Sequence, residues 1–245
     1  MDAEVRRARR DGLGVALATS AYGVSFGALA VASGLDILQA AVLSLVMFTG
    51  GSQFAFVGVV ASGGVAALPA AIASAALLGV RTVAYGLRMA PIIGGGVARR
   101  LLAAPFTIDE STAIALSVES TRARRVGFWV TGIGIYVGWG ASTVLGALLG
   151  DVLGDPRAYG LDAAAAAAFL ALLWPRLRRL DAVVVGIVAA VVATALLPVV
   201  APGVPVLIAG ATAVVVALLW PASRGRAGAS ERAEPDDVAE RKGMP

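Results

Sequence analysis

Apolar residues fill this chain in runs of about 15 to 25 positions, separated by short groups of glycine, proline and charged residues. A helix needs about 20 apolar residues to cross the hydrocarbon core of a bilayer, so runs of this length predict membrane helices. We therefore expect an all-α, polytopic helical membrane protein with about seven to eight membrane segments. The expected segments lie near residues 13–32, 38–61, 65–92, 101–119, 126–150, 161–175, 181–200 and 204–220.

Two of these segments need a choice. Segment 101–119 either spans the membrane, which gives about eight crossings, or re-enters on one side, which gives about seven. The sequence leaves both possibilities open. Segment 13–32 follows a basic stretch in the manner of a secretory signal peptide, but it is too long for the apolar part of one and many spans follow it. We expect it to be the first membrane helix.

Polar residues gather at the two ends of the chain and define its organisation. Residues 1–11 form a basic N-terminus, residues 12–222 a single transmembrane domain, and residues 223–245 a polar tail with no periodic apolar face. Such a tail cannot bury enough apolar surface to fold, so we expect it to be disordered.

Composition supports the membrane assignment and excludes several chemistries. Apolar residues make up 58% of the 245 positions, with 30 further glycines, and the mean hydropathy is +0.84; a soluble globular protein is excluded. The chain has no histidine and no cysteine, which excludes thiolate and histidine-based catalysis and cysteine or histidine metal sites. We expect no enzymatic activity, no cofactor and no bound metal.

The basic residues, nearly all arginine, stand in short clusters between apolar runs. This arrangement is typical of helix orientation in a membrane rather than of nucleic-acid binding. It predicts that the N-terminus and the C-terminal tail are both cytoplasmic.

The second apolar run is interrupted by Thr49, Gly50, Gly51, Ser52 and Gln53. Adjacent glycines weaken a helix, and a serine can cap a new one, so we expect a discontinuous helix with Ser52 as its cap. Its exposed amide groups would suit the carboxylate of a substrate. The alternative is close helix packing at the glycines, with Gln53 hydrogen-bonded between helices.

A second polar group follows Pro105 and comprises Thr107, Asp109 and Glu110. The spacing of Thr107 and Glu110 is that of a capping box, which predicts a second discontinuous helix beginning there. Carboxylates at membrane depth mark ion or proton pathways, or pair with a base. The alternative is a helix that begins at the membrane interface.

Arg81 stands in the middle of an apolar segment, too far from either end to reach water. We expect it to pair with Asp109 or Glu110, or to hold a substrate carboxylate, since its guanidinium suits either partner. A purely structural ion pair is the alternative. Small residues recur every fourth position along a later segment and predict close packing against another helix; they are Gly134, Gly138, Ser142, Gly146, Gly150 and Gly154.

The residues just described resemble those of the AzlC family, the large subunit of AzlCD-type branched-chain amino acid exporters. The likeness rests on Gly-Gly-Ser-Gln-Phe-Ala (Gly50 to Ala55), Gly-Val-Arg-Thr (Gly79 to Thr82), Tyr85 and the Asp109-Glu110 pair, and covers roughly residues 12 to 220. Where the family commonly has Asn-Leu-Arg-His, this chain has Gly79, Val80, Arg81 and Thr82, so its substrate or coupling can differ.

The resemblance implies a bacterial inner-membrane exporter of neutral amino acids that works with a small AzlD-like membrane subunit. Under this reading the substrate carboxylate meets Gly51, Ser52, Gln53 or Arg81, and the ammonium group meets Asp109 or Glu110. The apolar side chain of the substrate is assigned to Phe54 and Phe56. The sequence has no phosphate-binding loop motif, so an ion gradient, with protons as the expected ion, would drive export. The alternative is a non-transporting membrane subunit for assembly or regulation.

Overall fold

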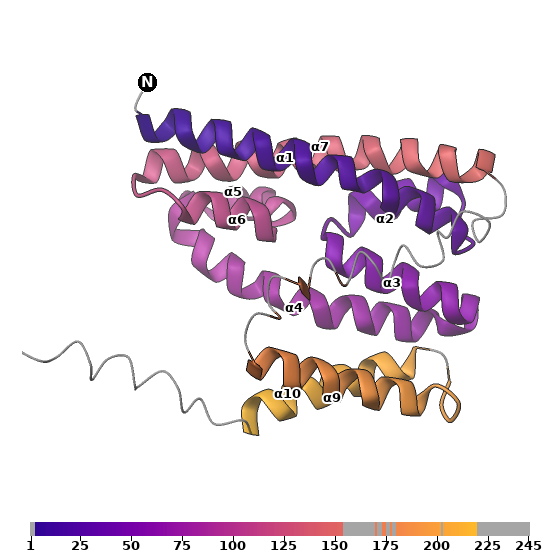
Figure 1. The fold of residues 1–245 in the computed structure, drawn as a ribbon. Helices are drawn as coiled ribbons and strands as arrows, with labels where there is room; N and C mark the ends of the chain where they lie inside the picture. Colours follow the sequence, from indigo (N-terminus) through magenta and orange to yellow (C-terminus); the bar gives the residue numbers. More distant parts are fainter. Residues whose placement is uncertain are drawn as a thin grey trace, which may run out of the picture.

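A computed structural model describes residues 3–153, 170, 173–174, 177, 180–201 and 203–219 (Figure 1). Within these residues every regular element is helical, as the apolar pattern predicts. The expected tail at 223–245 and most of segment 161–175 lie outside the described residues.

Three long helices run the length of the bundle: α1 (Ala3–Ala32), α4 (Leu68–Ile93) and α7 (Thr121–Leu153). At 1.5 Å per residue they are about 45, 39 and 50 Å long, which exceeds the roughly 30 Å of a bilayer core. Each of them lies in one of the described stretches that are long and apolar enough to cross a membrane, Ala3–Ala32, Gly50–Ile93 and Thr121–Val152, the second of which also includes the residues before α4. The chain is therefore a helical membrane protein.

Helices α1 and α7 lie side by side and parallel (Figure 1). The small residues that recur at every fourth position of α7 form the contact between them. A side chain on Gly146 would collide with the backbone at Val24, and one on Gly27 with the backbone at Thr143. The packing expected for Gly134, Gly138, Ser142, Gly146 and Gly150 is thus confirmed; Gly154 lies outside the described residues.

The segment expected to cross the membrane at 38–61 is instead a hairpin of two half-length helices, α2 (Ile37–Val46) and α3 (Gly50–Gly63). The short helix η1 (Gly64–Ala67) links α3 to α4, and the chain reverses at Gly64, whose φ is +57°. Leu35, just before α2, packs against a buried cluster that includes Val59 and Val60 near the end of α3. Both ends of the hairpin therefore lie at the same end of the bundle, where α1 ends and α4 begins.

A second hairpin comprises α5 (Val97–Ala103), η2 (Ala104–Phe106) and α6 (Asp109–Leu116). It leaves and returns at the other end of the bundle, which we call the basic end. There Arg125 Nε of α7 donates to the carbonyl oxygen of Ile92 in α4 at 2.7 Å, and the Glu4 carboxylate of α1 accepts from the backbone N–H of Ser120 at 3.0 Å. Of the two possibilities for segment 101–119, the structure has the re-entrant one.

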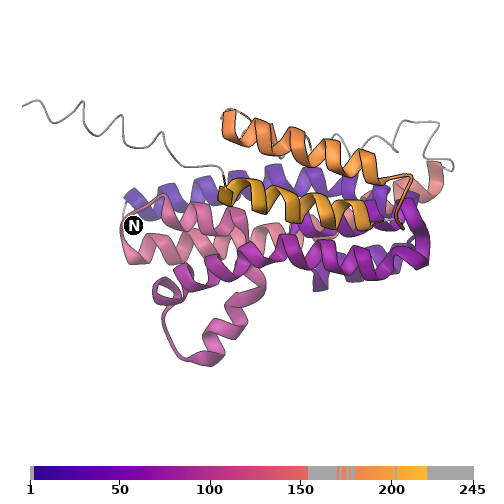
Figure 2. The same ribbon diagram turned by 90° about the horizontal axis from the view of Figure 1, so that it is seen from below.

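Two further helices, α9 (Leu180–Leu196) and α10 (Val204–Leu219), pack against each other, and α10 lies on α4 (Figure 2). They match the segments expected at 181–200 and 204–220. The described helices do not establish the full count of seven to eight membrane segments. They do establish two hairpins inserted from opposite ends between long helices.

Candidate functional site

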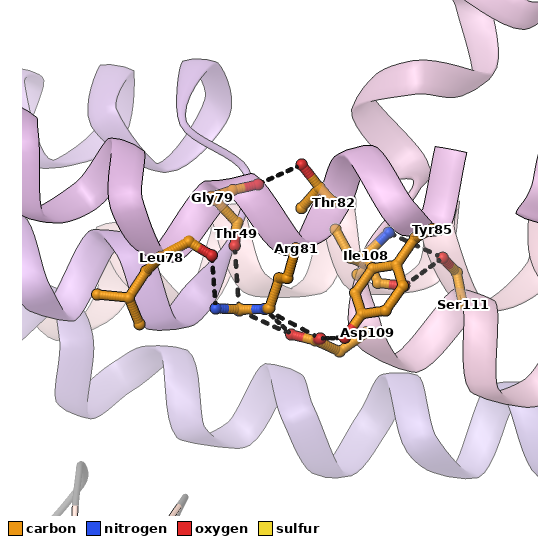
Figure 3. Close-up of polar contacts among 9 residues, drawn as sticks. All are labelled: Thr49, Leu78, Gly79, Arg81, Thr82, Tyr85, Ile108, Asp109 and Ser111. Atoms are coloured by element: carbon orange, nitrogen blue, oxygen red, sulfur yellow. Dashed lines mark hydrogen bonds and ion pairs between the residues drawn. The ribbon is translucent and has the colours of Figure 1, made fainter. Parts of the chain in front are cut away.

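Arg81 lies close to the middle of α4, about 20 Å from its first residue and about 18 Å from its last. Its guanidinium forms an ion pair with Asp109, the first residue of α6: Nε lies 3.1 Å from each carboxylate oxygen and Nη2 lies 2.8 Å from Oδ2 (Figure 3). The expected pairing of Arg81 with an acidic residue of the second polar group is confirmed, and among the described residues its ion-pair partner is Asp109 rather than Glu110.

The ion pair belongs to a small network that holds its geometry. Tyr85, one helical turn after Arg81, donates its hydroxyl to Asp109 Oδ1 at 2.5 Å, and Arg81 Nη1 donates to the carbonyl oxygen of Leu78 at 3.0 Å (Figure 3). Asp109 also stands in the first turn of α6, where the helix dipole favours a negative charge. The side chains of Arg81 and Asp109 are 26% and 39% exposed, so the pair is only partly buried within the described residues.

The first helix break brings α3 to the same guanidinium. Arg81 Nη2 lies 3.5 Å from Thr49 Oγ1, and a Cβ added at Gly51 would lie 3.1 Å from Nη2. Thr49 is the N-cap of α3 but its side chain caps no backbone group, so the expectation that Ser52 caps this helix is wrong. The reason is that α3 begins at Gly50, which places Ser52 inside its first turn.

The side chain of Ser52 is buried inside the first turn of α3. It is only 1% exposed, and its hydroxyl has no hydrogen-bond partner among the described residues. The hydroxyl lies 3.8 Å from where a Cβ on Gly79 would stand, which directs it toward α4 two residues before Arg81. A buried hydroxyl without a partner costs free energy, and it is a ready ligand for a polar group that enters the site.

Gln53, which is fully buried, connects three helices. Its amide nitrogen donates to the carbonyl oxygens of Met47 at 2.6 Å and Ser44 at 3.2 Å, at the end of α2, and its amide oxygen accepts from Trp139 Nε1 at 2.9 Å. Of the two interpretations of the first break, the side chain of Gln53 fits hydrogen bonding between helices. It satisfies carbonyl groups that the break would otherwise leave exposed in the membrane.

The second helix break occurs at Thr107 and Ile108, where the sequence predicts it, but its cap differs. Ile108 rather than Thr107 is the N-cap of α6, and its backbone N–H donates to Ser111 Oγ at 3.2 Å. Thr107 instead donates its hydroxyl to the carbonyl oxygen of Ala103 at 3.0 Å. The capping box expected between Thr107 and Glu110 is therefore wrong, and Glu110 is not occupied by it.

The two phenylalanines assigned to a substrate pocket, Phe54 and Phe56, lie in or against the hydrophobic core. Phe54 is 1% exposed and packs against Tyr22, Phe26 and Trp139, with ring centroids 5.2 to 6.3 Å apart. Phe56 packs against the same core cluster. A substrate contact at either residue stays a prediction.

The two breaks meet at Arg81, but the described cavity near them is lined from one break only. A cavity of about 400 Å³ lies between α4 and α5, and its walls include Thr82, Gly86, Arg100 and Thr107. Residues of the first break do not line it. A common cavity for both breaks stays a prediction; what the two breaks share in the structure is the guanidinium itself.

Sequence reasoning did not identify Tyr85 or Thr49 as partners in the network around Arg81. The signal for Tyr85 is its spacing, because residues four apart in a helix lie on the same face. Thr49 carries no comparable signal, since its approach to Arg81 depends on how the α2 and α3 hairpin is inserted.

Of the comparisons with known proteins, the one with protein families gives a match. The chain matches no solved structure and no curated protein sequence significantly. The family model described as AzlC protein matches residues 14–153, which include both hairpins and all the site residues discussed above. This family and the long apolar helices together indicate a membrane protein with a transport-related function. The chain belongs to the AzlC family.

Proposed function

We propose that the protein exports branched-chain or similar neutral amino acids across the bacterial inner membrane, together with a small AzlD-like membrane subunit. Membership of the AzlC family supports a transport role, and the substrate, the partner and the direction of transport are part of the proposal. The observation that carries it is the position of Arg81, a cation at mid-depth that touches both helix breaks.

The arrangement suits an amino acid because it offers separate positions for the two charged ends. The N-terminus of α3 and the Arg81 guanidinium are both positive and attract a carboxylate. Asp109 and Glu110, at the start of α6, are the candidates for the ammonium group. Since Asp109 already pairs with Arg81 and Tyr85, Glu110 is the better candidate for the ammonium.

Proton coupling follows from the same carboxylate. A carboxylate that binds a proton loses its charge and with it the attraction for an ammonium group. Protons entering from the outside would therefore compete with the substrate at Glu110 and promote its release, which drives export at the expense of a proton gradient. The carrier is Glu110 or, alternatively, Asp109.

The distribution of arginines supports the proposed orientation. The described arginines other than Arg81 gather toward the basic end of the bundle, at the starts of α1 and α7, the end of α4 and the start of α5 (Figure 1). Arginine-rich ends of membrane helices face the cytoplasm. We accordingly assign the N-terminus and the basic end to the cytoplasm, with the C-terminal tail on the same side.

The test is efflux of amino acids from cells loaded with dipeptides of leucine, valine or isoleucine, with the protein expressed alone and together with its small partner. Accumulation of the free amino acid outside the cells, dependent on this chain and on the proton gradient, is the expected result. An absence of efflux in both conditions would refute the exporter and favour the non-transporting subunit.

The coupling is tested with the matched variants Glu110→Gln and Asp109→Asn. We expect Glu110→Gln to bind substrate but to lose the dependence of efflux on the pH gradient. Full pH-driven efflux in both variants would place the proton path on other residues.

A further inference from the structure

The two hairpins share a sequence pattern. The dipeptide Phe-Thr occurs in the chain only as Phe48-Thr49 and Phe106-Thr107, one at each helix break. The long helix before each hairpin carries Ala-Tyr-Gly, around Tyr22 in α1 and around Tyr85 in α4. A third copy of this tripeptide, at 158–160, lies outside the described residues.

The shared residues also make the same kinds of contact. Phe48 and Phe106 both pack edge-on against the ring of Tyr136 in α7, with centroids 4.9 and 5.5 Å away. Four residues after each threonine, a side chain bonds back to a carbonyl group before the break: Gln53 to Met47 and Ser111 to Phe106, each at 2.6 Å. Because the hairpins enter from opposite ends, the units α1–α3 and α4–α6 are an inverted pair (Figure 1).

The correspondence assigns a counterpart to each residue of the ion-pair network. Counting two residues from each threonine, Asp109 in the second unit corresponds to Gly51 in the first, and Tyr85 corresponds to Tyr22. In the second unit the tyrosine hydroxyl and the aspartate carboxylate bond to each other. In the first unit the position that corresponds to Asp109 is Gly51, which has no carboxylate, and the buried hydroxyl of Tyr22 has no partner among the described residues.

We propose that the substrate carboxylate binds at Gly51 and takes the place that the Asp109 carboxylate takes in the second unit, with Tyr22 as a ligand. This proposal rests on the proposed function, and it adds Tyr22 as a ligand and the orientation of the substrate, with its carboxylate at Gly51. The carboxylate would be held by Arg81, the hydroxyls of Tyr22 and Ser52 and the first amide groups of α3. Ser52, buried and without a partner among the described residues, faces α4 beside Arg81, and the Tyr22 ring lies against Phe54, 5.2 Å away, in the same first turns of α3.

Binding is tested by supplying the missing carboxylate from the protein. At Gly51 the nearest atoms to an added side chain belong to the flexible end of Arg81, 3.1 Å from the added Cβ. Gly51→Asp is therefore accommodated when the guanidinium shifts by a few tenths of an ångström, and Gly51→Asn is a control of the same size without charge. The readout is the rise in melting temperature of the purified protein with L-leucine or L-valine. We expect Gly51→Asp to abolish this rise. We expect Tyr22→Phe to require about tenfold more amino acid for the same rise, with an unchanged melting temperature in its absence.

The equivalence of positions 51 and 109 is tested without any substrate. Asp109→Asn leaves Arg81 without its ion pair and should lower the melting temperature. Adding Gly51→Asp to that variant should restore it, because the guanidinium lies within reach of both positions, whereas adding Gly51→Asn should not. No restoration would overturn the correspondence.

The outcomes separate the two proposals. If amino acids stabilise the unmodified protein and still stabilise the Gly51→Asp variant equally, the carboxylate binds elsewhere and the inference is overturned. If no neutral amino acid stabilises the unmodified protein in the presence of its partner subunit, the proposed function fails, while restoration by Gly51→Asp would still support the inverted correspondence.

Discussion

Replacing Arg81 by alanine tests the centre of the site. The change removes the three contacts to Asp109, at 2.8 to 3.1 Å, and the contact to Thr49. Losing one partner of a fully buried ion pair costs about 3–5 kcal/mol, and an exposed pair is worth about 0–1 kcal/mol. With side chains 26% and 39% exposed, we expect a loss of folding stability of about 1–2 kcal/mol.

The effect on the substrate is expected to be larger. A hydrogen bond to a charged group contributes about 1.5–3 kcal/mol, which corresponds to roughly a 10- to 160-fold change in affinity for each bond to the carboxylate. We therefore expect Arg81→Ala to remain in the membrane and to lose amino-acid efflux. Arg122→Ala, a change at an exposed arginine of the basic end, is the control and should transport normally.

A second variant separates a structural role from a binding role. Removing both charges, in Arg81→Ala with Asp109→Ala, eliminates the unpaired carboxylate and should recover part of the lost melting temperature. It should not recover efflux, because the cation that receives the substrate is still absent. Normal efflux from Arg81→Ala, or recovery of efflux in the double variant, would show that Arg81 serves only to neutralise Asp109.

Other predictions concern the elements that support the site. Gln53→Ala should lower the free energy of unfolding by about 1–3 kcal/mol, measured by denaturation in detergent, because it leaves buried carbonyl groups of α2 and the Trp139 N–H without their partner; an unchanged stability would contradict this role. Gly27→Ala should prevent the close approach of α1 and α7 and reduce the amount of folded protein in the membrane, whereas Gly58→Ala, which meets nothing within 4 Å, should be neutral; equal yields of the two variants would contradict the packing.

The sequence predicts the features of this protein that follow from the cost of polar groups in a membrane. A guanidinium in the middle of an apolar helix requires a partner, and that is why the pairing of Arg81 with the Asp109 region could be predicted. Adjacent glycines and a proline disfavour helix, and when they stand beside polar residues inside an apolar run they predict a helix break. Both predictions depend only on neighbouring residues and on the bilayer as the surrounding solvent.

The direction of the chain after each break could not be predicted in this way. Segment 38–61 has enough apolar residues to cross the membrane, and hydropathy does not distinguish a crossing from a hairpin of two half-helices. The reversal depends on contacts distant in sequence, such as the bond from Trp139 to Gln53 and the packing of Leu35 on the end of α3. The exact caps were missed because Ser111, rather than Glu110, bonds back to the start of α6.

The two breaks differ in charge, because the chain places acidic side chains at the start of α6 and none in the first turn of α3. At each break a side chain of the following helix, Gln53 or Ser111, satisfies carbonyl groups left by the preceding one. Each helix N-terminus contributes about half a positive charge. The first turn of α6 carries Asp109 and Glu110, whereas α3 has no acidic residue in its first turn. Arg81 lies beside Gly51, but its charge is already balanced by Asp109, 2.8 Å away. The unbalanced charge at the start of α3 is therefore that of its own amide groups, and a small molecule with a carboxylate would neutralise it on binding and share the Arg81 guanidinium with Asp109.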